Sequence, residues 1–490
     1  MTLVAGLDYG GSSLKAWVAD LGTGEVHSAV TEPTATTRPR PYAAEFSPAE
    51  WWEATGTAMR AAVEAAGRPL GDYAGVTASS LRQGFVLVGG DDGGHELGPG
   101  ILNSDRRGAT HLDLLRSRIG VEALYALTGH WPAPELTLPK LLDVAAHQPQ
   151  LWRDAERMLF VHDWALWRMS GEAVTEVSYA CAGQMADVGR RAWATDLLDE
   201  LGLGTSRLAR LVESATVVGQ LSDPTLGLPL GIPVIASGGD AQVAALGAGG
   251  MVPATVCVVA GSTTPLQAAV TSFPVDPLRH PWVSTHLEPD LWVAETNAGY
   301  AGMNFGWLAA TTDRTPAELA DLATASVPGA RGITATVASP IWSEESWATK
   351  APSTLVGFTM AHQMADVARA FVEAHAYAVR ANVDDLERAV GGVPFERVLV
   401  TGGAARAPAF RQLLADVTGR VLTVPDVRDS AAAGGAALAA RALGADHRPP
   451  PTTSVVVEPR PDEAYEAGFR RYLAIFESMQ AHLPPEAYAG

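Results

Sequence analysis

Small and polar residues stand beside glycines at four places in the chain, a combination that suits phosphate chemistry. Asp8 ends the apolar run LVAGLDY, and Asp240 follows the run PVIASGG. The residues after Asp8 are small or basic: Gly10, Gly11, Ser12, Ser13 and Lys15. The third place is the run GSTT at 261–264, and the fourth is the pair Gly402 and Gly403. Phosphoryl transfer needs N–H groups around the phosphates, a carboxylate near Mg²⁺ and a base for the attacking hydroxyl, and these segments contain all of them.

The two aspartates have a second possible explanation, since a carboxylate in a surface turn needs no function. Each of them, however, follows an apolar strand and lies beside glycines, where an isolated charge is costly unless something pairs with it. We therefore expect Asp8 and Asp240 to be functional.

The glycine turn after Asp8 differs from the familiar nucleotide-binding loops. Leu14, Ala16 and Val18 alternate with Lys15 and Trp17, as in a strand. A P-loop or a dinucleotide fingerprint requires the glycine turn to open a helix. The opening of the chain is therefore predicted to be strand, glycine turn and strand, followed by a further hairpin.

A second strand-turn-strand, TVCVVAGSTTPLQAAV, begins at residue 255. Its likeness to the opening of the chain suggests that a domain has been duplicated, although two hairpins of a common type could be alike by chance. A chain of 490 residues exceeds what one hydrophobic core usually supports. We expect two domains, 1–246 and 247–490, with mostly helical sequence near 109–215.

The last part of the chain contains the third glycine turn. The stretch RVLVTGGAARAPAFRQLLADVTGRVLTVP predicts strand, turn, helix and strand. The helix of small residues at 429–443 permits close approach, either to neighbouring elements or to a flat ligand. An amphipathic helix is expected to follow and to pack back onto this unit.

Composition excludes several classes of protein. A net charge of −19 opposes binding to nucleic acid or to anionic membranes. The chain start lacks the features of a signal peptide and no stretch is long and apolar enough to span a bilayer, so we expect a cytoplasmic protein. Cys181 and Cys257 are expected to be buried free thiols. No two histidines share an HxxxH spacing, so we expect no histidine metal site.

In their order, the four segments resemble those of the FGGY carbohydrate kinases, members of the actin-like ATPase superfamily. GLDYGGSSLKA is similar to the first phosphate motif, GIPVIASGGDAQVAALGAG to the catalytic segment, VVAGSTT to the second phosphate motif, and VLVTGGAARAPAFRQLLADVTGRVL to the adenosine motif. HDWALWRMSGEAVTEVSYA (162–180) resembles the stretch that precedes the catalytic segment. The resemblance implies an α/β fold of two actin-like ATPase (ribonuclease H-like) domains with a cleft between them.

The resemblance also implies a role for each matching residue. Asp240 would be the catalytic base and Asp8 would lie near Mg²⁺. The phosphates of ATP would meet residues of the first two turns: Gly10, Gly11, Ser12, Ser13, Lys15, Gly261, Ser262, Thr263 and Thr264. Adenine and ribose would meet Gly402, Gly403 and Ala404. Relatives often carry Asn or Ser near Ala407, so a side-chain contact to the nucleotide is expected to be missing there.

On the sugar side, the resemblance points to the loops SSLRQGFVLV and GILNSDRRG. It nominates Arg82, Gln83, Asn103 and Asp105 as hydrogen-bonding groups. Most similar is the branch with xylulokinase-like and autoinducer kinase-like proteins, although xylulokinases usually carry Met-His-Gly where this chain has Arg82-Gln83-Gly84. The implied substrate is a small open-chain ketose or polyol, and a homodimer is possible. The alternatives are an actin-like ATPase that switches a protein partner, and a catalytically silent sugar sensor.

Overall fold

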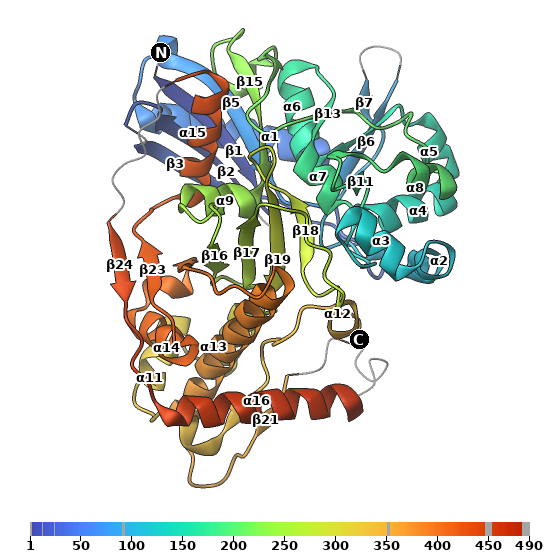
Figure 1. Ribbon diagram of the computed structural model, residues 1–490. Helices are drawn as coiled ribbons and strands as arrows, with labels where there is room; N and C mark the ends of the chain where they lie inside the picture. Colours follow the sequence, from blue (N-terminus) through green and yellow to red (C-terminus); the bar gives the residue numbers. More distant parts are fainter. Residues whose placement is uncertain are drawn as a thin grey trace.

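The first sheet of the molecule is built around the opening hairpin (Figure 1). The computed structural model describes residues 2–11, 13–23, 25–90, 94–349, 353–445 and 453–482, so Ser12 lies outside the described residues. Strand β1 (Leu3–Tyr9) pairs antiparallel with β2 (Ser13–Asp20), which pairs with β3 (Val26–Pro33). On its other side β1 pairs parallel with β5 (Tyr73–Ser80), then come β15 (Pro233–Gly239) and β14 (Val217–Gln220). The predicted strand, glycine turn and strand is thus confirmed.

A second sheet repeats this arrangement in the C-terminal half. Here β16 (Thr255–Val259) pairs antiparallel with β17 (Pro265–Val270), which pairs with β19 (Trp292–Asn297). On its other side β16 is parallel to β22 (Arg397–Thr401), followed by β23 (Leu422–Pro425). Strands β18 (Trp282–Thr285) and β24 (Ser454–Val457) form the edges. The shared order around β1 and β16 confirms the predicted duplication.

A mainly helical region is inserted between β5 and β15, on the right in Figure 1. It has a small sheet formed by β6 (Phe85–Gly89), β7 (His95–Glu96), β8 (Gly100–Ile101) and β9 (Arg157–Phe160), to which β4 (Glu45–Phe46), from before β5, adds an edge strand. The 3₁₀ helix η2 (Arg107–His111) leads into its helices, which are α2 (Leu112–Arg118), α3 (Val121–Thr128), α4 (Thr137–His147), α5 (Pro149–Asp154), α6 (Val161–Ser170), α7 (Val177–Ala182) and α8 (Thr195–Glu200). Two short strand pairs, β10 (Val174–Glu176) with β13 (Arg210–Val212) and β11 (Ala186–Asp187) with β12 (Ala192–Trp193), complete it.

The helix of small residues, α15 (Ser430–Ala442), lies against the N-terminal sheet (Figure 1). It packs on α9 (Asp240–Gly247), where a Cβ on Gly434 would come within 1.9 Å of the Val243 carbonyl oxygen. A Cβ on Gly247 would equally meet the Ser430 carbonyl oxygen at 1.9 Å. The small residues therefore serve close packing between helices. Because a late helix joins the first sheet, the division at 246/247 remains a prediction.

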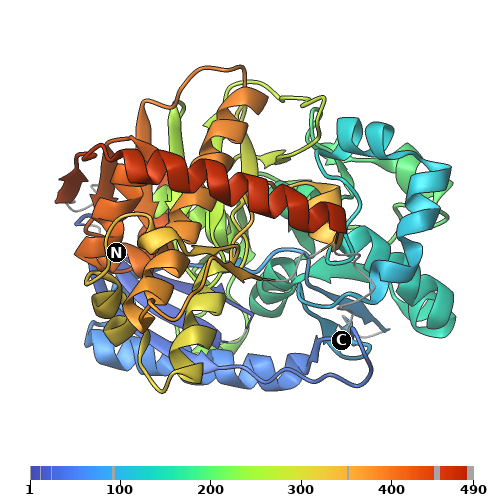
Figure 2. The ribbon, with the colours of Figure 1, turned by 90° about the horizontal axis from the view of Figure 1, so that it is seen from below.

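The remaining helices cover the two sheets. Helix α1 (Pro48–Ala66) is capped by Ser47, whose hydroxyl accepts from the Glu50 N–H. In the C-terminal half, α10 (Ala301–Thr311), α11 (Pro316–Ala323) and α14 (Pro408–Thr418) pack on the long α13 (Met364–Ala389). Strand β20 (Thr334–Ala335), which also contacts α13, pairs with β21 (Leu355–Val356), and the short helix α12 (Glu344–Thr349) lies between these two strands in the sequence. The C-terminal helix α16 (Glu463–His482) lies across this half in both views (Figures 1 and 2) and packs on α13 and α14, as predicted.

Both cysteines are buried free thiols, in agreement with the sequence. Within the described residues, we found no helix with the length and hydrophobicity that a bilayer span requires.

Candidate functional site

The two predicted carboxylates lie at the carboxyl ends of β1 and β15, the strands on either side of β5. In the sheet register Asp8 of β1 is opposite Ser79 of β5, and Ser80 is opposite Gly239, the residue before Asp240. The Ser79 hydroxyl donates to Asp8 Oδ1 at 2.9 Å, and the Ala241 N–H donates to Asp240 Oδ1 at 2.7 Å. Because the carboxyl ends of parallel strands meet at one edge of a sheet, chain order brings these two acids to one place.

Their shared surroundings change how both acids titrate. The pKa of Asp240 is raised to about 7, chiefly because the surrounding protein displaces water and secondly because Asp8 is charged, while Arg82 opposes the change. Burial also raises the pKa of Asp8, against the lowering effects of Ser79 and Lys15. A carboxylate whose pKa lies near neutral pH is suited to take a proton from an alcohol.

Two aromatic side chains hold the strand ends that carry these acids. The Tyr179 hydroxyl donates to the Gly238 carbonyl oxygen at 2.8 Å and accepts from the Ser80 N–H at 2.9 Å. The His162 ring stacks on Tyr179 with centroids 4.7 Å apart, and His162 Nε2 accepts from the Ser237 N–H at 3.2 Å. Since these bonds tie β5 to β15 beside Asp240, they fix the position of its backbone.

The predicted sugar-binding residue Arg82 is joined to an acid from the other half of the chain. Arg82 Nη2 lies 2.7 Å from Glu295 Oε1, and Gln267 Nε2 donates to Glu295 Oε2 at 2.6 Å. Burial alone would raise the pKa of Glu295, but the charge and hydrogen bond of Arg82 hold it below its ordinary value. The Arg82 side chain also passes close to Gly239, where an added Cβ would meet Arg82 Cδ at 2.9 Å. The Arg82 guanidinium therefore interacts with the charges of both Glu295 and Asp240.

A buried lysine holds the two loops that were predicted to bind sugar. Lys140 Nζ donates to the carbonyl oxygens of Leu102 at 2.8 Å, Gln83 at 3.1 Å and Asn103 at 3.4 Å. Burial lowers the pKa of Lys140 to about 7. Gln83 has a positive φ of 66°, an uncommon conformation for this residue type. The Lys140 bonds therefore brace a strained backbone beside the site.

Asp105 is placed differently from our expectation. It is fully buried, and its carboxylate accepts from the Ala44 N–H, from the Arg107 N–H and from the Arg107 guanidinium. Because both oxygens already have protein donors, these contacts give Asp105 a role in holding its loop and offer no support for a direct sugar contact. Asn103, in contrast, is partly exposed, and its Oδ1 lies 3.8 Å from the position of a Cβ on Gly11.

A cavity of about 750 Å³ in the C-terminal half is lined by some of the predicted nucleotide residues. Gly261 and Ser262 lie on its lining together with Gly403 and Ala404. Gly402 has a φ of +97°, and a Cβ there would meet the Ala260 carbonyl oxygen at 2.6 Å, so this turn requires glycine. The cavity has the size of small-molecule and cofactor sites, and apolar groups such as Phe410 also line it.

Two predicted phosphate ligands have partners within the protein. The Thr264 hydroxyl is fully buried and lies 2.8 Å from His375 Nε2, so it faces the interior and not the turn surface. Lys15 Nζ lies 3.0 Å from Asp429 Oδ2, next to the start of α15. In the first turn, the Gly10 N–H donates to the Ser13 carbonyl oxygen at 2.9 Å, which closes the turn at its base.

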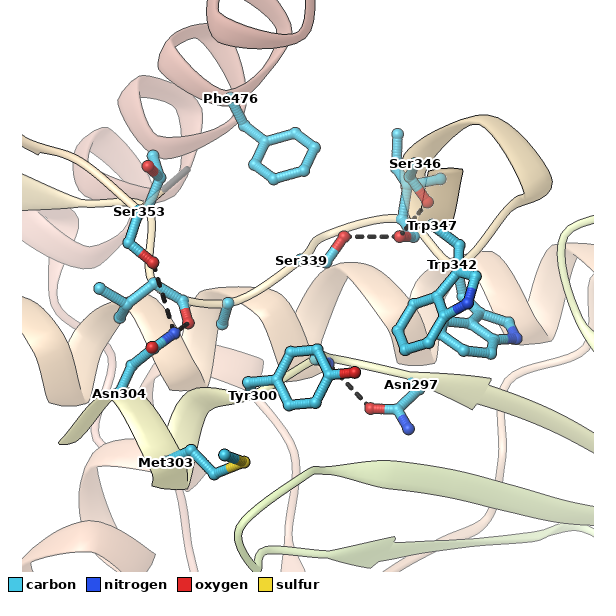
Figure 3. A pocket seen from close by; sticks show the side chains of 15 residues that line it. Asn297, Tyr300, Met303, Asn304, Ser339, Trp342, Ser346, Trp347, Ser353 and Phe476 are labelled. Atoms are coloured by element: carbon cyan, nitrogen blue, oxygen red, sulfur yellow. Dashed lines mark hydrogen bonds between the residues drawn. The ribbon is translucent and has the colours of Figure 1, made fainter. Parts of the chain in front are cut away.

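A second cavity, of about 440 Å³, lies on the other side of the loop after β19 (Figure 3). Tyr300, Trp342 and Trp347 form one side of it, and Phe476 of α16 forms another. Neither cavity is lined by Asp8 or Asp240.

Sequence reasoning missed several residues at this site. Glu295 is the one charged residue of β19, and Lys140 shares α4 with Asp143, so neither belonged to a motif that sequence reasoning could recognise. Gly302, where a Cβ would meet the Gly261 carbonyl oxygen at 2.0 Å, closes the second phosphate turn and gave no separate signal.

Comparison with known proteins agrees with this geometry. Residues 3–247 match the N-terminal domain of the FGGY family of carbohydrate kinases, and 255–443 match its C-terminal domain. The xylulose kinase of Escherichia coli is 30% identical over 85% of both chains. An autoinducer-2 kinase of Salmonella paratyphi B is 27% identical over 97% of this chain and 94% of its own.

Solved structures show the same fold. The xylulose kinase of Rhodospirillum rubrum superposes with a TM-score of 0.87 at 25% identity, covering 98% of this chain and 99% of its own. The duplicated sheets are those of the actin-like ATPase fold, as the sequence predicted. The chain therefore belongs to the FGGY family of carbohydrate kinases and phosphorylates a sugar hydroxyl.

Proposed function

We propose that this kinase transfers the γ-phosphate of ATP to a terminal hydroxyl of a small, uncharged, open-chain ketose or polyol. The observation that carries the proposal is the meeting of Asp240, Asp8 and the Arg82–Glu295 pair at the ends of β15, β5 and β1. The names of the relatives, xylulose kinase and autoinducer-2 kinase, support a substrate of this kind.

Asp240 is the general base in this proposal. It accepts the proton of the attacking hydroxyl while the oxygen bonds to the γ-phosphorus and ADP leaves. A positioned base contributes about 10²–10⁴ in rate, and the raised pKa of Asp240 suits the task. Asp8 is the side chain that would hold Mg²⁺, which neutralises phosphate charge when bound. The charge of Asp8 raises the pKa of Asp240, and a cation next to Asp8 would relieve that repulsion.

The nucleotide occupies the cavity that Gly261, Ser262, Gly403 and Ala404 line. Its phosphates extend from there toward the first turn; Gly10, Gly11 and Ser13 of that turn and Thr263 of the second turn remain candidate contacts. Lys15 can contribute only if it exchanges Asp429 for phosphate. The side chain of Thr264 is left out because it is buried against His375.

The charges around Asp240 favour an uncharged substrate. Glu295 already neutralises Arg82, while Asp8 and Asp240 add negative charge. His130 lies close enough to Arg82 and Glu295 for their charges to affect it, and burial lowers its pKa to about 4, so its ring is neutral. Its Nε2 is buried and has no hydrogen-bond partner within the described part of the chain. A sugar hydroxyl could satisfy this atom, whereas a carboxylate would meet net negative charge.

A coupled assay of ADP release tests both the reaction and the substrate class. The panel contains pentuloses, pentitols, erythrulose, glycerol and the autoinducer-2 precursor, with gluconate as a charged compound of similar size. We expect saturable ADP release with one or more neutral compounds and none with gluconate. Asp240→Asn should reduce turnover by at least about 10² while leaving ATP binding intact.

Three results would contradict the proposal. Preference for gluconate would refute the uncharged substrate, and full activity of Asp240→Asn would refute the base. Rapid ADP release without any sugar would instead favour an ATPase that acts on a protein partner.

A further inference from the structure

A cluster of two histidines and an aspartate lies outside the kinase site, where η2 packs on α4. His111 is the last residue of η2, and Asp143 and His147 stand one turn apart on α4. One ligand atom from each side chain lies within 4.8 Å of the other two. We propose that these three side chains bind a divalent transition-metal ion, with Zn²⁺ as the representative case.

The sequence did not predict this site. The absence of an HxxxH pair led us to expect no histidine metal site, but that spacing is needed only when both histidines come from one helix. Here the pair on the helix is Asp143 and His147, and the fold brings His111 from an earlier element.

The distances fit a small tetrahedral ion. His147 Nδ1 lies 3.0 Å from Asp143 Oδ1, and His111 Nε2 lies 3.9 Å from the same oxygen. Zinc bonds of about 2.0–2.2 Å at tetrahedral angles separate neighbouring ligands by about 3.4 Å. One of the two distances is shorter than that value and the other is longer, so small side-chain movements would bring both ligands to bonding distance from the ion. A water molecule would be the fourth ligand.

His111 offers a nitrogen that the protein does not use. Its Nε2 is buried and has no hydrogen-bond partner among the residues that the structure describes. A buried imidazole nitrogen without a hydrogen bond is available as a metal ligand.

A neighbouring arginine orients the carboxylate. Arg40 Nη2 lies 3.0 Å from Asp143 Oδ2, so the other oxygen, Oδ1, faces the histidines. His147 Nδ1 also donates to the backbone oxygen of Asp143 at 3.1 Å, so an ion bound at this nitrogen replaces that hydrogen bond and leaves the ring proton on Nε2. Two nitrogens and one oxygen suit Zn²⁺ better than Mg²⁺ or Ca²⁺, which prefer oxygen ligands.

The ion braces the sugar side of the enzyme without entering it. It joins η2 to α4, and α4 also carries Lys140, which holds the carbonyl oxygens of Leu102 and Asn103. Arg107, the first residue of η2, is bonded to Asp105 in the same loop. Metal binding therefore ties together the two elements that support residues 102–107.

Calorimetric titration of the full chain with ZnCl₂ tests the site. The protein carries no affinity tag, is stripped with EDTA, dialysed and kept free of nucleotide, which would chelate the metal. We expect one Zn²⁺ per chain and a rise in the thermal unfolding temperature on binding. His111→Ala and His147→Ala should each weaken binding by more than the 10–100-fold that loss of an outer partner typically costs. Arg40→Ala, which removes such a partner, should weaken it by about 10-fold.

His482→Ala is the matched control, because it removes an exposed histidine at the end of α16 and should leave affinity unchanged. Far-UV circular dichroism of the metal-free variants checks their folding, and His147→Ala, on an exposed residue, decides the question if His111→Ala does not fold. The absence of stoichiometric binding to the wild-type chain would overturn the proposal. Wild-type affinity in His147→Ala, or an equal loss in His482→Ala, would also overturn it.

Discussion

Replacing Asp240 by Asn separates the cost of burying this carboxylate from its use in catalysis. The pKa of Asp240 is about 7 in the folded chain, against an ordinary value of 3.8, chiefly because the surrounding protein displaces water and secondly because Asp8 is charged. Each pH unit of difference between folded and unfolded pKa corresponds to about 1.36 kcal/mol. An ionised Asp240 therefore opposes folding by at most about 4 kcal/mol.

The sign of this effect sets the pH at which it can be seen. A raised carboxyl pKa gives a contribution to stability that is fully present below pH 3.8 and is lost as the pH rises to about 7. Asparagine carries no charge at either pH, so Asp240→Asn should be more stable than the wild type at pH 8, with a smaller gap at pH 5. Because Asp240 keeps some contact with solvent, which screens the charge, we expect a gain of about 1–3 kcal/mol at pH 8.

Urea unfolding at pH 5 and pH 8, in EDTA and without ligands, measures this gain, and the coupled assay measures turnover on the same preparations. Asp8→Asn is the matched variant, since removing the Asp8 charge should lower the pKa of Asp240 and stabilise the ligand-free chain in the same direction. The reasoning fails if Asp240→Asn is no more stable than the wild type at pH 8. It also fails if the gain is larger at pH 5 than at pH 8.

Three further substitutions test the surroundings of the site. Glu295→Gln removes the partner of Arg82, which can then pair with Asp240 and lower the pKa of that carboxyl group. The acid limb of the plot of kcat/KM against pH should therefore move to lower pH, and an unchanged plot would contradict the pairing. Lys140→Met removes the donor from buried carbonyl oxygens, and each unpaired oxygen costs about 1–3 kcal/mol of stability. The loops that these oxygens hold should then move, so steady-state kinetics should show a rise of about 10-fold or more in KM for the sugar and little change in KM for ATP. Gly402→Ala places a Cβ 2.6 Å from the Ala260 carbonyl oxygen; calorimetry should then show weaker ATP binding and unchanged sugar binding.

The elements that depend on local sequence were predictable. Alternation after Gly11 indicated a hairpin and excluded a P-loop, because strand periodicity is set by adjacent residues. The second hairpin at 255–270 was found in the same way, and the shared strand order of the two sheets confirms that the likeness was not a coincidence. Asp8 and Asp240 were recognisable because an acid at the end of a buried strand and beside glycines is unusual.

Side-chain direction and long-range pairing were not predictable from these patterns. Thr264 belongs to a hydroxyl-rich turn by composition, but it directly precedes β17 and points inward to His375. Asp105 looked like a polar loop residue, yet Arg107 two positions later encloses it. Glu295 reaches Arg82 from a different sheet, and no local rule relates two residues so far apart in the chain.

The Arg82–Glu295 pair links the chemistry of Asp240 to the relative position of the two halves. Arg82 comes from the loop after β5, and Glu295 lies in β19 of the second sheet, so the ion pair exists only while the halves are together. If they separate, Arg82 loses its partner and can pair with Asp240, whose pKa would then fall and whose ability to accept a proton would weaken. When they meet, Glu295 draws Arg82 away and Asp240 becomes a stronger base. Asp240, the proposed proton acceptor, is therefore the stronger base while Glu295 holds Arg82.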